Sequence, residues 1–178
     1  MLRAREVVGI DPNRRSINAA AVRAQGYDLG SCAVRFEAVD AGRSLPFPDG
    51  RFDLITCVSV MEFVSAPSGR ATFARELQRV TKPGGHIFIA TPSPWRLREY
   101  HSRLWLGHLR RRDGYPWSSS PKAIRRMFAD CERRPIAAFV LNDFLERRRL
   151  PSLPLARIFA PALVAAMPRQ KHLFRKRS

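Results

Sequence analysis

Two acidic residues each follow directly behind a run of residues that is typical of a buried strand. Asp11 ends the stretch "VVGID", and Asp40 ends "VRFEAVD". A carboxylate held at the carboxyl edge of a parallel sheet can accept hydrogen bonds from both hydroxyl groups of a ribose. An acid at such a position can also simply cap the helix that follows, because its oxygen accepts a hydrogen bond from a free backbone N–H. Asp11 therefore predicts a ribose-binding position at a sheet edge, with helix capping as the alternative.

The elements around these acids alternate between strand and helix patterns. A helix is predicted over 12–26, where Asn13 can cap the start and Gly26 the end. A second helix is predicted from Ser68 onward, closed by the turn "KPGG". Strand patterns cover 7–11, 34–41, the continuous apolar run 52–64, and 86–92. This alternation predicts an α/β fold with a mostly parallel sheet.

The second half of the chain has a looser pattern. We expect an arginine-rich amphipathic helix over 95–112, a capped helix starting near Ser120, and strands over 135–145 and 171–178. The sequence contains no repeat and no linker, so residues 1–178 are predicted to form one domain. Within it, 1–95 would be the core and 96–178 a basic C-terminal part.

Charge is distributed unevenly along the chain. The sequence has 32 Lys and Arg residues against 15 Asp and Glu, a net charge of +17. Residues 1–95 contain twelve basic and nine acidic residues, whereas 96–178 contain twenty and six. A solvated helix face is the ordinary explanation; the sharper ones are binding to an anionic membrane surface or to nucleic acid, and of these we favour the membrane. No stretch reads as a transmembrane helix or a signal peptide, which predicts a cytoplasmic, membrane-associated protein.

The segments "VVGIDPN", "VRFEAVDA", "LPFPDGRFDLITCVSVMEFV" and "RELQRVTKPGGHIFIATP" follow one another in the order and spacing seen in one known family. The chain resembles the class I S-adenosylmethionine-dependent methyltransferases, and more narrowly their small-molecule "type 11" branch. The resemblance covers about residues 2 to 95. It implies a Rossmann-like methyltransferase sandwich with S-adenosylmethionine as the cofactor.

The resemblance also implies roles for individual residues. Asp11, with Pro12 behind it, would bind the ribose hydroxyls, and Asp40 would receive the adenine amino group, with the backbone N–H of Ala41 reaching a ring nitrogen. The end of the strand in 52–64 would form the floor under the methionine part of the cofactor. The residues expected there are Cys57, Val58 and Ser59.

Candidates for lining a substrate pocket are Glu62, Tyr100, His101 and His108. No general base is identified among them. Methyl transfer does not require one, because it depends mainly on the positioning of the two reactants. His101 and His108 lie two helical turns apart but lack a third ligand, so no metal site is predicted.

This sequence departs from the family pattern in two places. Phe63 stands where the family often has a histidine, which bears on substrate binding. The family also places a first strand, a glycine-rich loop and a first helix before "VVGID", and these are absent from the sequence. We therefore expect a truncated domain in which the gap closes by rearrangement, is filled by another chain, or does not exist in the real gene product, because unpaired strand edges shut off from water are costly.

The sequence thus predicts methyl transfer from S-adenosylmethionine to a small-molecule or lipid-like acceptor. The alternative from another class is a non-catalytic methyltransferase remnant, or a basic module that binds nucleic acid or a membrane. A nicotinamide-binding domain is less consistent with the sequence motifs, because it would account for Asp11 but not for Asp40 together with the "LPFPDGRFD" loop.

Overall fold

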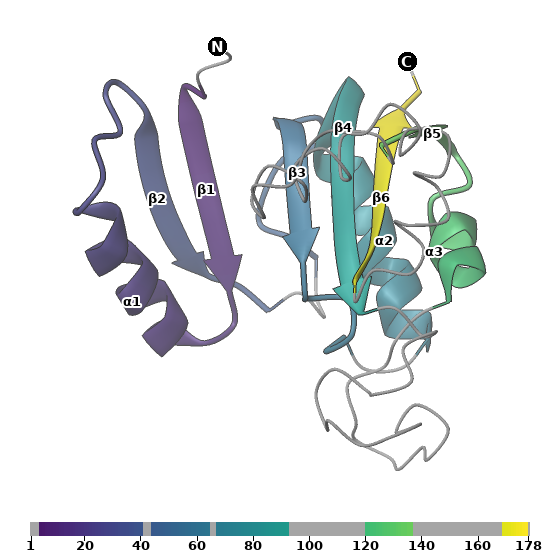
Figure 1. The fold of residues 1–178 in the computed structure, drawn as a ribbon, viewed down its shortest axis with the longest axis horizontal. Coiled ribbons are helices and arrows are strands. Elements are labelled where there is room, and N and C mark those ends of the chain that lie inside the picture. Colours follow the sequence, from purple (N-terminus) through teal and green to yellow (C-terminus); the bar gives the residue numbers. More distant parts are fainter. Residues whose placement is uncertain (1–3, 41–43, 65–66, 93–119, 137–168, 178) are drawn as a thin grey trace, which may run out of the picture. The chain divides into compact units, whose positions relative to one another are not determined.

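The computed structural model describes residues 4–40, 44–64, 67–92, 120–136 and 169–177. The chain divides into two compact units, Met1–Pro46 (unit 1) and Phe47–Ser178 (unit 2), which are described separately below. Both contain parallel strands and helices, as expected of an α/β chain (Figure 1). Ala41, the helix predicted over 95–112 and most of the strand predicted over 135–145 lie outside the described residues.

Unit 1 consists of strand β1 (Glu6–Asp11), helix α1 (Arg14–Ala24) and strand β2 (Ala33–Ala38). The two strands are parallel and pair in register from Glu6 opposite Ala33 to Asp11 opposite Ala38. The helix begins where the sequence predicts, because the Asn13 side chain accepts a hydrogen bond from the backbone N–H of Arg15 at 2.9 Å. The predicted strand–helix–strand order is therefore confirmed.

The packing inside unit 1 is thin. Gly9 lies opposite Phe36, and a Cβ at position 9 would come within 2.6 Å of the Phe36 ring. No residue between 4 and 40 is buried, and α1 has no buried side chain. The strand pair is thus held by its backbone ladder, by the Gly9–Phe36 contact and by the exposed Arg35–Glu6 ion pair at 3.2 Å.

Unit 2 contains a four-stranded sheet in the order β3-β4-β6-β5 (Figure 1). The strands are β3 (Phe52–Val58), β4 (Thr81–Pro92), β5 (Cys131–Arg134) and β6 (Arg169–Lys176). Strands β3 and β4 are parallel, whereas β6 lies antiparallel between β4 and β5. The expectation of a mostly parallel sheet is corrected here to a mixed one. The alternation of side chains along β6 marks it as a strand, but it carries no information on direction.

Several predicted boundaries differ from the structure. Strand β3 ends at Val58 instead of continuing to residue 64, because Ser59 turns the chain with φ of +56°. The predicted "KPGG" turn lies inside β4, where the pairing with β3 shifts between Phe52 and Leu54 and Gly84 has φ of +75°. At the other edge of the sheet, β5 ends just before Pro135, so it is not the strand that the sequence predicts over 135–145.

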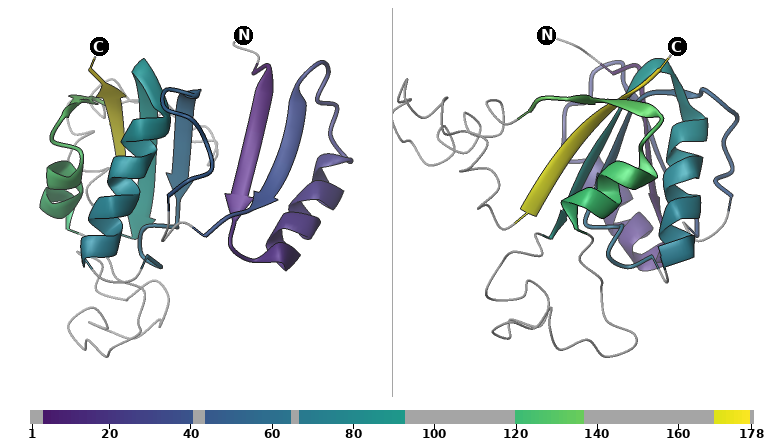
Figure 2. Two further views of the ribbon diagram at one scale, coloured as in Figure 1. Left: turned by 180° about the vertical axis from the view of Figure 1, so that it is seen from behind. Right: turned by 90° about the vertical axis from the view of Figure 1, so that its right-hand side faces the viewer.

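Helices α2 (Pro67–Val80) and α3 (Pro121–Met127) cover one face of this sheet (Figure 2). They contact each other through Gln78, whose side-chain amide donates a hydrogen bond to the carbonyl of Met127 at 3.0 Å. Beneath them, Ile87 and Ile89 of β4 are fully buried. Phe128, just beyond α3, stacks on Phe174 of β6 with ring centroids 4.7 Å apart. Unit 2 therefore has a dense apolar core.

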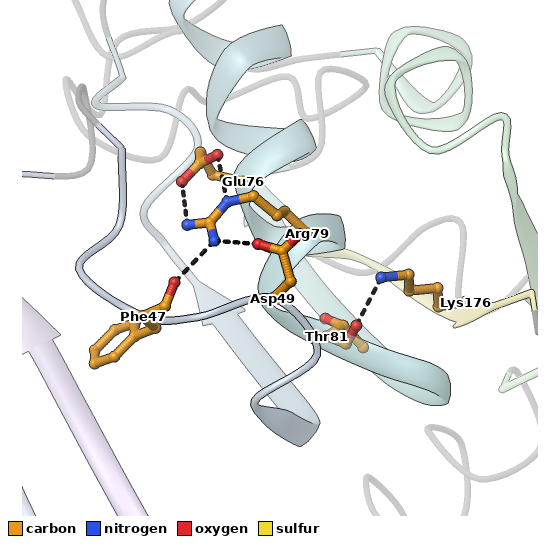
Figure 3. Close-up of polar contacts among 6 residues, drawn as sticks. All are labelled: Phe47, Asp49, Glu76, Arg79, Thr81 and Lys176. Atoms are coloured by element: carbon orange, nitrogen blue, oxygen red, sulfur yellow. Dashed lines mark hydrogen bonds and ion pairs between the residues drawn. The ribbon is translucent and has the colours of Figure 1, made fainter.

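The loop that enters β3 is clamped by one arginine of α2. The Arg79 side chain donates hydrogen bonds to Glu76, to Asp49 at 2.7 Å and to the carbonyl of Phe47 at 2.8 Å (Figure 3). Its own carbonyl accepts a hydrogen bond from the backbone N–H of Gly50 at 2.9 Å. The "LPFPDGRFD" motif is therefore anchored at Phe47, at Asp49 and at Gly50 itself, where the chain turns with φ of +61°.

Candidate functional site

The predicted site residues fall into two groups at the carboxyl ends of parallel strands. Asp11, Pro12 and Asp40 belong to unit 1, and the segment 57–62 belongs to unit 2. Ligands of α/β proteins bind outside the carboxyl ends of such strands. Of the predicted site residues, Ala41, Tyr100, His101 and His108 lie outside the residues that the structure describes.

Asp11 is the last residue of β1 and is partly exposed. Its Oδ1 atom accepts a hydrogen bond from the backbone N–H of Asn13 at 2.7 Å. Asp11 therefore does hold the turn between β1 and the helix that follows. The second carboxylate oxygen, Oδ2, has no hydrogen-bond partner among the described residues. The geometry therefore leaves one oxygen of Asp11 available to a ligand.

Asp40 lies at the same edge of unit 1 as Asp11. Asp11 pairs with Ala38, and its carbonyl accepts a hydrogen bond from the backbone N–H of Val39 at 3.2 Å. Asp40 is the next residue and is exposed. The structure thus brings the two acids to the ends of neighbouring strands.

Cys57 and Val58 end β3 and differ sharply in exposure. Cys57 is buried among the core residues under α2, at 3% exposure, whereas Val58 is 45% exposed. Burial first, and then the charge of the nearby Glu62, raise the pKa of the Cys57 thiol to about 12. The thiol is therefore protonated at neutral pH and unsuited to act as a nucleophile. Any contact that Cys57 makes with a ligand would be through packing.

Ser59 has unusual backbone geometry and an unsatisfied hydroxyl. It is the only non-glycine residue with positive φ in the described parts of the chain. Its backbone N–H donates a hydrogen bond to the carbonyl of Ala90 at 2.8 Å, while its buried Oγ has no partner among the described residues. Strained residues and buried polar atoms without partners are both concentrated at ligand sites. Ser59 therefore carries the features expected of a binding residue in unit 2.

Glu62 is 1% exposed, and its Oε2 atom accepts a hydrogen bond from the hydroxyl of Thr91 at 3.1 Å. Thr91 itself is fully buried near the carboxyl end of β4. This pair joins the turn after β3 to the end of the neighbouring parallel strand. Sequence reasoning missed Thr91. The polar residue at the end of the apolar strand "HIFIATP" was the available signal.

Two negative findings apply to the described residues. No three His, Cys, Asp or Glu side chains in the described ranges lie close enough to hold a metal ion. In those same ranges, no helix has the length and apolar character needed to cross a membrane.

A family model described as "Methyltransferase domain", Methyltransf_11, matches residues 1–89 of the 178 residues. Curated relatives include the ubiquinone biosynthesis O-methyltransferase of Acinetobacter baylyi, 28% identical over 89 residues, which cover 50% of this chain and 35% of the relative. The enzyme of the same name from Ralstonia nicotianae is 32% identical over 85 residues, covering 48% of this chain and 33% of the relative. The match thus spans only about a third of the length of these relatives.

Solved structures of low sequence identity share the fold. A Pyrococcus horikoshii protein, PH0226, superposes with a TM-score of 0.60 at 16% identity, covering 97% of this chain and 72% of the other. The N-methyltransferase NodS from Bradyrhizobium japonicum, in complex with S-adenosyl-L-homocysteine, gives a TM-score of 0.58 at 15% identity, covering 97% and 67%.

Proposed function

Because the chain belongs to the Methyltransf_11 family of class I S-adenosylmethionine-dependent methyltransferases, we propose that it transfers a methyl group to a small-molecule or lipid-like acceptor. The observation that carries this proposal is the pair of acids at the ends of β1 and β2. Asp11 keeps one carboxylate oxygen without a partner among the described residues, and Asp40 follows the neighbouring strand.

The residues of unit 1 fit the nucleoside part of this cofactor. Asp11 would accept the ribose hydroxyls through its available oxygen while its other oxygen holds the turn to Asn13. Asp40 would accept the adenine amino group, and Ala41 would donate its backbone N–H to the ring. Pro12 would border the same ligand.

The residues of unit 2 fit the methionine part. The buried Ser59 hydroxyl, which lacks a partner among the described residues, could donate or accept a hydrogen bond. Val58 offers an exposed apolar surface and Cys57 a neutral, buried one. When bound, the cofactor supplies a methyl group on a positively charged sulfur. The side chains of this chain then have to orient the two reactants and exclude water.

The acceptor side is proposed from the relatives and the remaining candidates. The two ubiquinone biosynthesis enzymes are O-methyltransferases by name, which supports an acceptor hydroxyl. Glu62, Tyr100 and His101 are proposed to line the acceptor site. The net charge of +17 supports association with an anionic membrane, where a lipid-like acceptor would lie. That residues 1–178 act as one domain also stays a prediction.

A charge-removing pair of variants tests the cofactor site. In unit 1, Asp28 makes the same kind of turn as Asp11, because its Oδ1 accepts a hydrogen bond from the N–H of Gly30 at 3.0 Å. Asp11→Asn keeps the turn-forming oxygen but loses the charge, and Asp28→Asn is its matched control. We expect calorimetric titration with S-adenosylmethionine to show about ten- to hundredfold weaker binding for Asp11→Asn, from the loss of a charged hydrogen bond. Unchanged affinity would mean that Asp11 only shapes the turn.

The alternative is a remnant that keeps the fold without the reaction. If the wild-type chain and the Asp28→Asn control are equally well folded and the wild-type chain does not bind S-adenosylmethionine, the remnant is favoured over the enzyme.

A further inference from the structure

Positive charge in the described structure is concentrated at one end of unit 2. Residues 120–136 and 169–177 contain ten Lys and Arg side chains but only two acids. The remaining described residues contain ten and nine, so they are almost neutral. The excess therefore belongs to α3, β5 and β6 (Figure 2, right panel).

Helix α3 presents its cations on the side away from the core. Ile124 is fully buried, whereas Lys122, Arg125 and Arg126 are exposed. Residues spaced by three and four positions lie on one face of a helix. These three cations therefore form a single exposed row.

The strands next to α3 add further cations: Arg133 lies on the same face of the sheet as the buried Phe174, and Arg134 and Arg175 lie on the opposite face. Arg133 and Arg134 are exposed on β5, which is the outer strand of the sheet. Arg175 and Arg177, at the end of β6, are exposed as well, and Arg175 pairs with Glu132 of β5. We call the seven exposed cations of these elements the basic edge; they are Lys122, Arg125, Arg126, Arg133, Arg134, Arg175 and Arg177.

Little neutralises the basic edge. Within it, Arg134 forms an ion pair with Glu132 at 2.8 Å, and the charges of Arg175 and Arg177 also act on this one carboxylate. Arg125 and Arg175 donate hydrogen bonds to the carbonyls of Pro121 and Gly84, which are neutral acceptors. Burial first, and then the charges of Arg133 and Arg125, lower the pKa of His172. These two arginines belong to different elements, yet both influence the same histidine side chain.

Two ordinary roles account for part of this pattern. Charged residues on an outer strand prevent unwanted pairing with other chains, which explains Arg133 and Arg134. Cations in the last turn of a helix stabilise its dipole, which explains Arg125 and Arg126. Neither role explains Lys122 at the start of α3, Arg175 near the end of β6 or Arg177 just beyond it.

We infer that the basic edge is a docking surface for an anionic membrane. Each Lys or Arg close to an anionic bilayer strengthens binding about fivefold, and seven of them lie at this edge of unit 2, on the two faces of its outer strands. Single-stranded nucleic acid fits less well, because its recognition relies on exposed aromatic side chains for base stacking. The phenylalanines of these elements, Phe128 and Phe174, are 1% exposed. Docking through these residues is separate from methyl transfer, since none of them is proposed to bind the cofactor or the acceptor.

Vesicle co-sedimentation of the full chain tests the inference. The probes are phosphatidylcholine vesicles, alone or with about a quarter phosphatidylglycerol. The test variant carries Arg125→Ala, Arg126→Ala and Arg133→Ala. Its control carries Arg14→Ala, Arg15→Ala and Arg23→Ala, which removes the same charge from the exposed residues of α1. A third variant carries Arg125→Lys, Arg126→Lys and Arg133→Lys, which keeps the positive charge at each position.

We expect the wild-type chain to bind only the anionic vesicles, and less as salt rises, since salt screens such attraction. The test variant should bind about a hundredfold more weakly, the control less than about fivefold, and the Lys variant about as well as wild type. Far-UV circular dichroism checks folding. Should the test variant not fold, Arg175→Gln with Arg177→Gln examines the same edge near the end of β6.

Three results would overturn the inference. They are equal weakening of the test variant and its α1 control, equal binding to neutral vesicles, and stronger retention on duplex RNA than on anionic vesicles at the same salt. The last would instead make the basic edge a nucleic-acid surface, bound through phosphates alone.

Discussion

Unit 1 and unit 2 begin from the same motif, a pair of parallel strands with an intervening helix, yet they pack very differently. Strand β4 of unit 2 contains the fully buried Ile87 and Ile89, whereas no residue between 4 and 40 of unit 1 is buried. Parallel strands are normally covered on both faces. In unit 2, one further helix and two further strands are added to the motif, whereas unit 1 has the motif alone among its described residues. A strand–helix–strand segment therefore gains a core only from additional elements.

The largest expected difference between the units comes from deleting an aromatic ring in each. Phe174→Ala in unit 2 should lower the free energy of unfolding by about 3–5 kcal/mol, because it removes a fully buried ring stacked on Phe128. Phe36→Ala in unit 1 should cost about 1 kcal/mol, the usual effect of changing a partly exposed residue. Urea unfolding measures both. Equal losses would contradict the contrast in packing.

A second expected difference is sensitivity to acid, since unit 1 contains no histidine. Burial, followed by the charges of Arg133 and Arg125, lowers the pKa of His172 to about 4. In the unfolded chain this pKa is about 6.5, so the unfolded state takes up the proton first as pH falls. The stabilisation is complete above about pH 6.5 and is lost toward pH 4, by about 3 kcal/mol.

His172→Phe isolates this contribution, because it keeps a ring beside Phe174, 6.0 Å away between centroids, and removes the titration. Urea unfolding between pH 7 and 4 should therefore show a shallower decline for the variant than for wild type. His86→Gln, in the same unit, serves as the control and should decline as wild type does. Parallel curves for His172→Phe and wild type would show that His172 does not govern the acid response.

The smallest expected difference concerns two glycines. A Cβ at Gly85 would lie 2.9 Å from the carbonyl oxygen of Lys82 and 3.0 Å from that of Asp53, which are backbone atoms. A Cβ at Gly9 would meet only the ring of Phe36, which can turn away. Gly85→Ala should therefore cost about 1–3 kcal/mol and Gly9→Ala less than about 1 kcal/mol. Thermal unfolding compares them, and a larger loss at Gly9 would mean that unit 1 is the more rigidly packed.

Much of the local structure could be predicted from the sequence, because it depends on near neighbours. Asn13 and Ser120 cap helices at the predicted positions, through hydrogen bonds to Arg15 and Ala123. The apolar alternation marked β2 and β6 as strands. Family motifs within residues 2–95 gave the fold class and the placement of Asp11 and Asp40 at strand ends, in agreement with the family match.

Only the tertiary structure decided how distant segments combine. The antiparallel insertion of β6 between β4 and β5 depends on which edges meet, and burial patterns are the same for either direction. The left-handed turn at Ser59, which ends β3 early, follows from its bond to Ala90, 31 positions along the chain. The burial of Glu62 against Thr91 likewise requires two strand ends to be neighbours. These contacts join residues far apart in the chain, and the physical reason that sequence patterns missed them is that such patterns record only neighbours a few positions away.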